Sequence, residues 1–130
     1  MKKIYLILLL PFLVATQCED EYSGFETNYL VQNNSGIDLF LLTEEDRLIK
    51  IESQSMISVG STLNSITSPI VPSESFVFSY IKLYAKDNDN YILVYIQDPV
   101  DDDLWVFSEP VLNRYEYELV ISDDIIDAIN

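Results

Sequence analysis

The stretch RYEYELVIS, residues 114–122, has the most regular alternation of apolar and charged side chains in the chain. One set of alternate positions is apolar, namely Tyr115, Tyr117, Leu119 and Ile121. The other set begins with the charged residues Arg114, Glu116 and Glu118. Because successive side chains of a β-strand point to opposite faces, this period of two predicts a half-buried antiparallel strand.

Similar segments recur along the chain, with turn residues between them every eight to twelve positions. The expected strands are residues 27–32, 37–42, 48–52, 56–59, 76–85, 91–96, 104–107 and 114–122. No repeat of 20–50 residues is visible, which argues against a propeller or solenoid. Seven or eight short strands predict an all-β fold, either an antiparallel β-sandwich or a small barrel.

The turn residues predict which strands form hairpins. Asn and Gly at positions 33–36 tolerate positive φ, so we expect strands 27–32 and 37–42 to pair. Strands 48–52 and 56–59 are expected as a second pair. Strands 76–85 and 91–96 are apolar on both faces, which predicts a central pair covered on both sides.

Two further segments are expected to differ from these strands. Residues 60–75 are rich in Ser and contain two prolines, which indicates a loop, part of which can be an edge strand. Residues 122–129 begin with Ser and Asp and predict a short C-terminal helix, with Ile125 and Ile129 one turn apart.

Composition excludes several classes of function. The chain has 130 residues, 48% of them hydrophobic, and a formal charge of −15. This charge argues against nucleic acid as a partner and against electrostatic attachment to anionic lipid. The sequence has no histidine, the commonest general base and metal ligand. No hydrolase or phosphate-binding motif appears, so we expect no enzymatic activity.

The first 17 residues have the plan of a bacterial secretory signal peptide. Lys2 and Lys3 precede an apolar run at residues 4–14, and polar residues follow before Cys18. The run is shorter than the ~20 residues that a membrane-spanning helix needs. Pro11 within it and the lack of a polar stripe argue against a core helix.

Residues 14–18, VATQC, resemble the lipobox of bacterial lipoproteins, in which the cysteine is acylated and becomes the first residue. Gln17 departs from the Gly, Ala or Ser usual before that cysteine. The acids Glu19, Asp20 and Glu21 resemble the export signal of surface lipoproteins in Bacteroidota. The resemblance implies a fatty-acid anchor (palmitate) at Cys18 and an outer-membrane, cell-surface location. An ordinary cleaved signal, with a periplasm-facing or secreted product, is the alternative.

These observations divide the chain into a signal peptide (1–17), a lipidated tether (18–26) and a single β-sandwich domain (27–130). The domain also resembles small flavobacterial-type lipoproteins of unknown function. The resemblance rests on Asn33 to Gly36 after the first strand and on the tyrosine-alternating strand with its acidic tail, Tyr115 to Ala128. It implies a fold and a location, and no activity.

Acidic turns are the candidate metal site. Asp87 and Asp89 have the spacing of the first two ligands of a calcium loop, but the later ligands of an EF-hand are missing. A different Ca²⁺ site requires this turn to lie at the same end of the sandwich as the run Asp101, Asp102 and Asp103. The alternative is two solvated turns, in which Asp and Asn are common.

Trp105 follows the acidic run and has two possible roles. At the rim of the domain it would stack against a glycan or a partner protein, whereas in the core it would pack against other strands. The sequence thus predicts a membrane-anchored, non-catalytic binding or envelope accessory module with a protein partner. A calcium- or glycan-binding surface module that uses residues 87–90 and 101–103 is the alternative.

Overall fold

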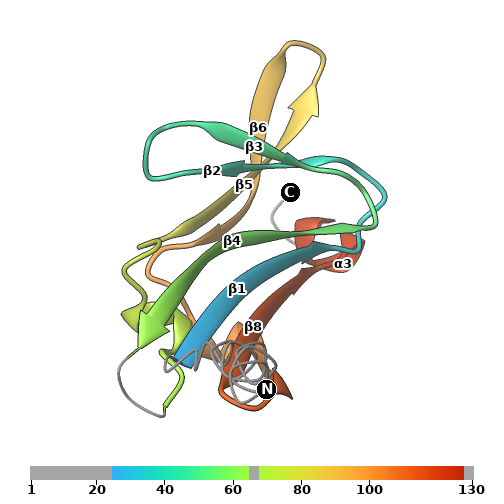
Figure 1. Cartoon of the computed structure of the whole chain (residues 1–130). Helices are drawn as coiled ribbons and strands as arrows, with labels where there is room; N and C mark the ends of the chain where they lie inside the picture. Colours follow the sequence, from blue (N-terminus) through green and yellow to red (C-terminus); the bar gives the residue numbers. More distant parts are fainter. Residues whose placement is uncertain (1–24, 65–67, 128–130) are drawn as a thin grey trace, which may run out of the picture.

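The computed structural model describes residues 25–64 and 68–127, which form two packed four-stranded sheets (Figure 1). Sheet A has the order β4 (Ser55–Asn64), β1 (Phe25–Asn33), β8 (Arg114–Ile121), β7 (Trp105–Val111). Sheet B has the order β3 (Leu48–Ile51), β2 (Leu39–Leu42), β5 (Ile81–Asp87), β6 (Asn90–Gln97). The predicted β-sandwich is therefore confirmed, and the barrel is wrong because the two sheets do not close on each other.

Short helices complete the described fold. They are the 3₁₀ turns η1 (Pro72–Glu74) and η2 (Asp102–Leu104) and the helix α3 (Asp123–Asp127). The predicted C-terminal helix is confirmed at α3, where Ile126 is buried, while Ile129 lies outside the described residues. The predicted tether was too long, because β1 already begins at Phe25.

The segment with the most regular alternation, residues 114–122, forms β8. Its burial alternates at every residue, with Tyr115, Tyr117, Leu119 and Ile121 inside. It pairs antiparallel with β7, as expected, but parallel with β1, so that Tyr117 lies opposite Tyr29. Pattern alone predicted the buried face of β8 correctly and missed the direction of one neighbour.

Both early hairpin predictions are wrong. β1 and β2 lie in different sheets, and so do β3 and β4. β2 instead pairs with β3, through a turn in which Asp46 has a φ of 57°. β4 pairs with β1 and extends to Asn64, so that part of the predicted 60–75 loop is an edge strand.

Residues 33–36 cross from one sheet to the other and do not form a hairpin turn. The first of them, Asn33, has a fully buried side chain. Asn33 Nδ2 donates hydrogen bonds to the carbonyls of Ile37 (2.8 Å), Ile51 (3.1 Å) and Glu52 (3.2 Å). Its Oδ1 accepts from the backbone N–H and the hydroxyl of Ser35. One buried amide thus provides hydrogen-bond donors for backbone carbonyls in both connections between the sheets, β1 to β2 and β3 to β4. A tight hairpin turn would not need such a donor.

Strands β5 and β6 pair as predicted, but β5 is shorter than predicted and only one face of the pair is buried. β5 and β6 pair antiparallel around a turn with Asn88 at a φ of 55°. β5 begins only at Ile81, because residues 76–80 leave the sheet and Phe78 enters the core. No second layer in the described chain covers the outer face of this pair, where Tyr91 and Leu93 are exposed.

Strand β7 continues through Pro110, beyond the end of the predicted strand at residues 104–107. β7 is an edge strand of sheet A, and an edge strand tolerates a residue without a backbone N–H. The core lies between the sheets around Tyr29. Its ring meets Phe78 edge-on at 5.2 Å and stacks on Tyr117 at 6.2 Å, and its hydroxyl donates to the Ile70 carbonyl at 2.9 Å.

Candidate functional site

The outer face of sheet B carries three of the five basic side chains in the described ranges of a strongly acidic protein. This sheet-B face consists of Phe40, Lys50, Lys82, Tyr84, Lys86, Tyr91 and Leu93. Strand register places Phe40 opposite both Lys50 and Tyr84, and places Lys86 opposite Tyr91. Buried residues such as Leu39 and Leu83 alternate with them and point inward.

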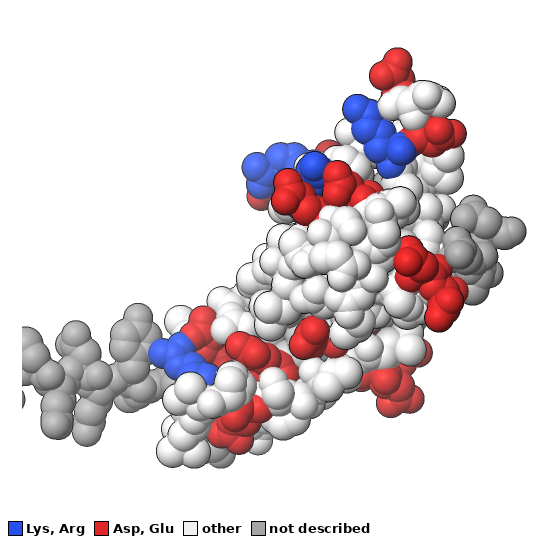
Figure 2. Space-filling model, turned by 90° about the vertical axis from the view of Figure 1, so that its right-hand side faces the viewer, with Lys and Arg blue, Asp and Glu red and all other residues white. Residues whose placement is uncertain are grey.

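Charge separates this face from the rest of the described surface. The described ranges hold five basic residues, of which Lys50, Lys82 and Lys86 lie on the sheet-B face and Arg47 lies in the turn between β2 and β3. Figure 2 shows most of the basic side chains toward one end of the molecule and others at the opposite end, with acidic side chains beside both groups. Arg47, Lys50 and Lys82 each pair with a carboxylate, so among these basic side chains only Lys86 has a positive charge that no described carboxylate neutralises.

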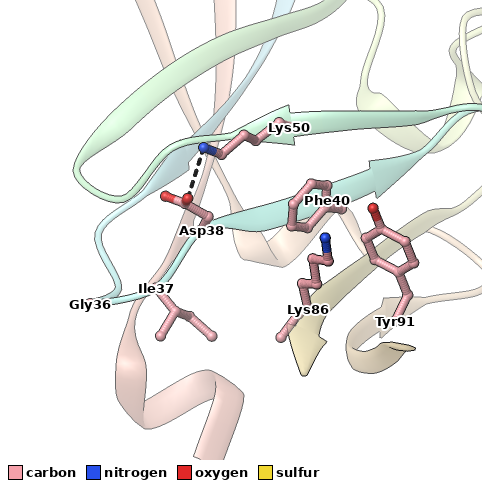
Figure 3. Close-up of a pocket in the computed structure, with 8 residues that line it drawn as sticks. Gly36, Ile37, Asp38, Phe40, Lys50, Lys86 and Tyr91 are labelled. Carbon is pink, nitrogen blue, oxygen red and sulfur yellow. Dashed lines mark ion pairs between the residues drawn. The ribbon is translucent and has the colours of Figure 1, made fainter. Parts of the chain in front are cut away.

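An open groove of about 580 Å³ lies on the sheet-B face. Its walls are formed by Gly36, Ile37, Asp38, Phe40, Lys50, Ala85, Lys86 and Tyr91. The rings of Phe40 and Tyr91 meet edge-on with centroids 5.0 Å apart. Figure 3 shows the Lys86 side chain extending toward the space between these two rings. All four strands of sheet B or their connections therefore contribute to one groove.

One wall of the groove carries a fixed ion pair (Figure 3). Lys50 Nζ lies 2.9 Å from Asp38 Oδ2 and 3.7 Å from Glu52 Oε1. The hydrogen bond from Lys50, together with the Ser53 backbone N–H, lowers the pKa of Asp38. The same hydrogen bond from Lys50 to Asp38 raises the pKa of Lys50. Both groups are therefore charged at neutral pH, and Lys50 is already neutralised by its neighbours.

Lys86 differs from every other basic residue in the described ranges. Arg47, Lys50, Lys82 and Arg114 each form an ion pair with a carboxylate, whereas Lys86 forms none with any described residue. Its ammonium group is exposed at the end of β5, beside two aromatic rings. An unpaired cation beside apolar rings can bind a ligand that carries an anionic group next to an apolar or ring-shaped group.

The predicted calcium site does not form, because the two acidic turns lie at opposite ends of β6. Asp87 and Asp89 lie at the β5–β6 turn, and residues 101–103 follow the other end of the strand. An eight-residue strand spans roughly 26 Å, much farther than one Ca²⁺ ion can bridge. No group of three or more His, Cys, Asp or Glu side chains with metal-binding geometry occurs among residues 25–64 and 68–127.

The acids of the second turn have a structural use. Asp102 accepts hydrogen bonds from the Ser73 backbone N–H at 2.7 Å and from its hydroxyl at 2.6 Å. Asp101 accepts from the backbone N–H of Asp103 at 3.1 Å. These contacts tie η2 to η1 and cap the 3₁₀ turn, as Asp residues commonly do.

Trp105 is a core residue, so its predicted role as a ligand-stacking residue at the rim is wrong. Its side chain is only 6% exposed. Its ring stacks on Phe78 at 5.6 Å, and its Nε1 donates to Gln97 Oε1 at 3.2 Å. The buried indole N–H thus finds the partner that it needs, and no face of the ring is free for a glycan.

The remaining predicted residues, Cys18 and the acids Glu19, Asp20 and Glu21, lie outside the described residues. None of the sequence-based predictions included the groove, although one signal was present. Tyr80, Lys82, Tyr84 and Lys86 alternate, which places aromatic and basic groups on one face of a strand. The contributions of β2, β3 and β6 depend on strand order, which no local pattern specifies.

Comparison of the chain with protein-family models, curated proteins and solved structures found no match. In the part of the chain that the structure describes, no helix has the length and apolar character needed to cross a membrane.

Proposed function

We propose that this protein is an exported, lipid-anchored and non-catalytic binding protein, whose sheet-B face takes an acidic segment of a partner protein. The observation that carries the proposal is the unpaired Lys86 beside the rings of Phe40 and Tyr91 in an open groove. Aromatic side chains are common anchors in protein interfaces, and a neighbouring cation selects an acidic partner.

The distribution of charge supports an acidic partner over a neutral one. The chain carries a formal charge of −15, so long-range electrostatics repel acidic proteins from most of its surface. Such a partner is attracted only near an unpaired cation such as Lys86, and this favours one docking orientation. Because salt screens both the repulsion and the attraction beyond about 10 Å at 0.1 M, we expect the preference for this one orientation to weaken as salt rises.

The N-terminal sequence supports the proposed location. A signal peptide at residues 1–17, acylation of Cys18 and an acidic export signal would place the domain on the outer membrane at the cell surface. Several acyl chains, at about 0.8 kcal/mol per buried CH₂ group, hold a soluble domain firmly on a bilayer. The absence of histidine from the sequence supports a role in binding without catalysis.

Fatty-acid labelling in cells tests the anchor. We expect the native protein to incorporate label and Cys18→Ala to remain unlabelled, and external protease to remove the labelled protein from intact cells. Label that is absent from the native protein would contradict the anchor. Labelled protein that resists external protease would contradict the surface location while leaving the anchor in place.

Photo-crosslinking in cells tests the binding face. Tyr91 is replaced by benzoylphenylalanine, and the matched control carries the same group at Val106, which is exposed on the outer face of sheet A. We expect a protein adduct at position 91 that Lys86→Glu abolishes and Lys86→Arg retains. Adducts that are the same at both positions, or that persist in Lys86→Glu, would contradict the proposed face.

An acidic glycan is the second candidate ligand. Tyr91 is 44% exposed and lies opposite Lys86 in the β5–β6 pair. Sugar rings stack on exposed aromatic faces, and a sugar carboxylate would meet the ammonium group. Binding to an array of acidic glycans that Tyr91→Ala abolishes would favour this ligand. If no acidic glycan binds, the acidic segment of a partner protein remains as the single candidate ligand.

A further inference from the structure

One end of the sandwich carries three exposed aliphatic side chains, which lie on β4 and at the β7–β8 turn, at the two edges of sheet A. Strand register aligns Leu63 of β4, Glu26 of β1, Arg114 of β8 and Val111 of β7 across the last level of sheet A. Leu112 follows in the β7–β8 turn, next to Asn113 with its φ of 64°. We call Leu63, Val111 and Leu112 the aliphatic rim.

All three side chains of the aliphatic rim are largely exposed to solvent. Leu63 is 73% exposed, Val111 is 64% exposed and Leu112 is 80% exposed. Such side chains gain free energy when they leave water, and Val111 and Leu112, which are adjacent in the chain, would do so together. The charges within the row do not prevent this, because Glu26 and Arg114 form an ion pair with each other.

The chain enters the sandwich at this same end. β1 begins at Phe25, and Figure 1 shows its start beside the start of β8. Cys18 lies seven residues earlier, and seven extended residues span at most about 25 Å. A fatty-acid anchor at Cys18 would therefore hold the aliphatic rim within about one domain length of the bilayer.

The groove on the sheet-B face lies toward the opposite end. β1 runs for nine residues, roughly 30 Å, from Phe25 to Asn33. Asn33 binds the carbonyl of Ile37, and Gly36, Ile37 and Asp38 line the groove. A domain that stands on its aliphatic rim would thus present the groove away from the membrane.

We propose that the aliphatic rim inserts into the lipid surface to which the chain is anchored, and so orients the domain with its groove outward. This inference rests on the proposed anchor at Cys18. The occupant is a lipid bilayer because the rim lies at the end where the tether enters and because the two charged residues aligned with it, Glu26 and Arg114, pair with each other. The contact is apolar and does not depend on anionic lipid, which the acidic chain would repel.

Bromolipid quenching of tryptophan fluorescence tests the insertion. The acylated full-length product is purified from membranes and reconstituted into phosphatidylcholine vesicles with bromine near the headgroup end of the acyl chains. Leu112→Trp reports on the rim, and Tyr91→Trp, also at an exposed position, reports on the far end. Trp105 is buried in every variant, so the native protein supplies its background signal.

We expect bromolipid to reduce the added fluorescence of Leu112→Trp at least about three times as strongly as that of Tyr91→Trp. Vesicle flotation is measured on the same samples. Native protein that fails to float would overturn the anchor and, with it, the insertion. Protein that floats while Leu112→Trp is not quenched would overturn the insertion and leave the anchor intact.

Two further results would also overturn the insertion. Equal quenching of both variants would mean that the domain lies on its side. Absence of quenching together with a doubled mass in light scattering would mean that a second copy covers the rim. Because Leu112 is exposed in a turn, we expect Leu112→Trp to unfold at the same temperature as the native protein.

Discussion

The two sheets of the sandwich have similar inner faces and opposite outer faces. Both inner faces are lined with large apolar side chains that meet around Tyr29. The outer face of sheet A carries Glu26, Glu116 and Glu118, whereas the sheet-B face carries three lysines and a cluster of rings. The inner faces determine the fold, and the outer faces are free to differ because solvent-exposed substitutions cost little stability.

Truncation of a shared core residue should destabilise both sheets at once. We expect Trp105→Ala to lower the free energy of unfolding by about 4 kcal/mol, since a buried tryptophan leaves a large cavity. Urea unfolding followed by circular dichroism measures this change, and we expect one transition for both sheets. The neighbouring Val106 is exposed, so Val106→Ala should cost less than about 1 kcal/mol. Similar losses in the two variants would contradict the assignment of Trp105 to the core.

Removal of a charge should change the affinity for an anionic ligand much more on the sheet-B face than on the outer face of sheet A. A small anionic aromatic probe, 2-naphthalenesulfonate, is expected to shift the NMR signals of Phe40 and Tyr91. Lys86→Gln should weaken its binding about tenfold, because one charge-assisted contact is worth about 1.5–3 kcal/mol and is partly screened here. Glu118→Gln, on sheet A, should change the affinity less than about twofold. Equal effects of the two variants would indicate that net charge alone governs binding.

The smallest expected effect concerns the ion pair in the groove wall. Lys50→Gln should raise the pKa of Asp38 toward its ordinary value of 3.8, because the hydrogen bond from Lys50 is the main cause of the lowering. A carboxylate with a lowered pKa stabilises the fold above its unfolded-state pKa, and the effect disappears as pH falls through the folded-state pKa. Acid unfolding of Lys50→Gln should therefore begin at a slightly higher pH.

Carbon-detected NMR titration of the Asp38 carboxyl between about pH 2 and 6 measures this pKa directly. Arg47→Gln is the matched control, since Arg47 pairs with Glu45 in the neighbouring turn. The pKa of Asp38 should not change in that variant. An unchanged pKa in Lys50→Gln would show that the backbone N–H of Ser53 alone stabilises the Asp38 carboxylate.

Local sequence predicted those features that depend on neighbours along the chain. The period of two in residues 114–122 gave the buried face of β8, and the turn at Asn88 gave the pairing of β5 with β6. The same reasoning failed at residues 33–36. Asn and Gly are typical of hairpin turns, but the partners of the Asn33 side chain include carbonyls 18 and 19 residues away. A turn residue whose role depends on distant groups has no local signature.

The candidate groove shows the same limit. Alternation along one strand indicates that Lys82, Tyr84 and Lys86 share a face, but β2, β3 and β6 complete the groove. Similarly, Trp105 beside an acidic turn is compatible with a rim or with the core. Only the approach of Phe78 and Gln97, from other parts of the chain, decides between them.

The sequence by itself determined the class of fold, the strand periods, the acidic character of the chain and the basis for expecting export. These properties depend on composition and on contacts between residues close in sequence. The tertiary structure decided which strands pair, which end carries the aliphatic rim and which face carries the lysines. Strand pairing joins residues far apart in sequence, such as Tyr29 and Tyr117, and its energy depends on how all the inner faces pack together.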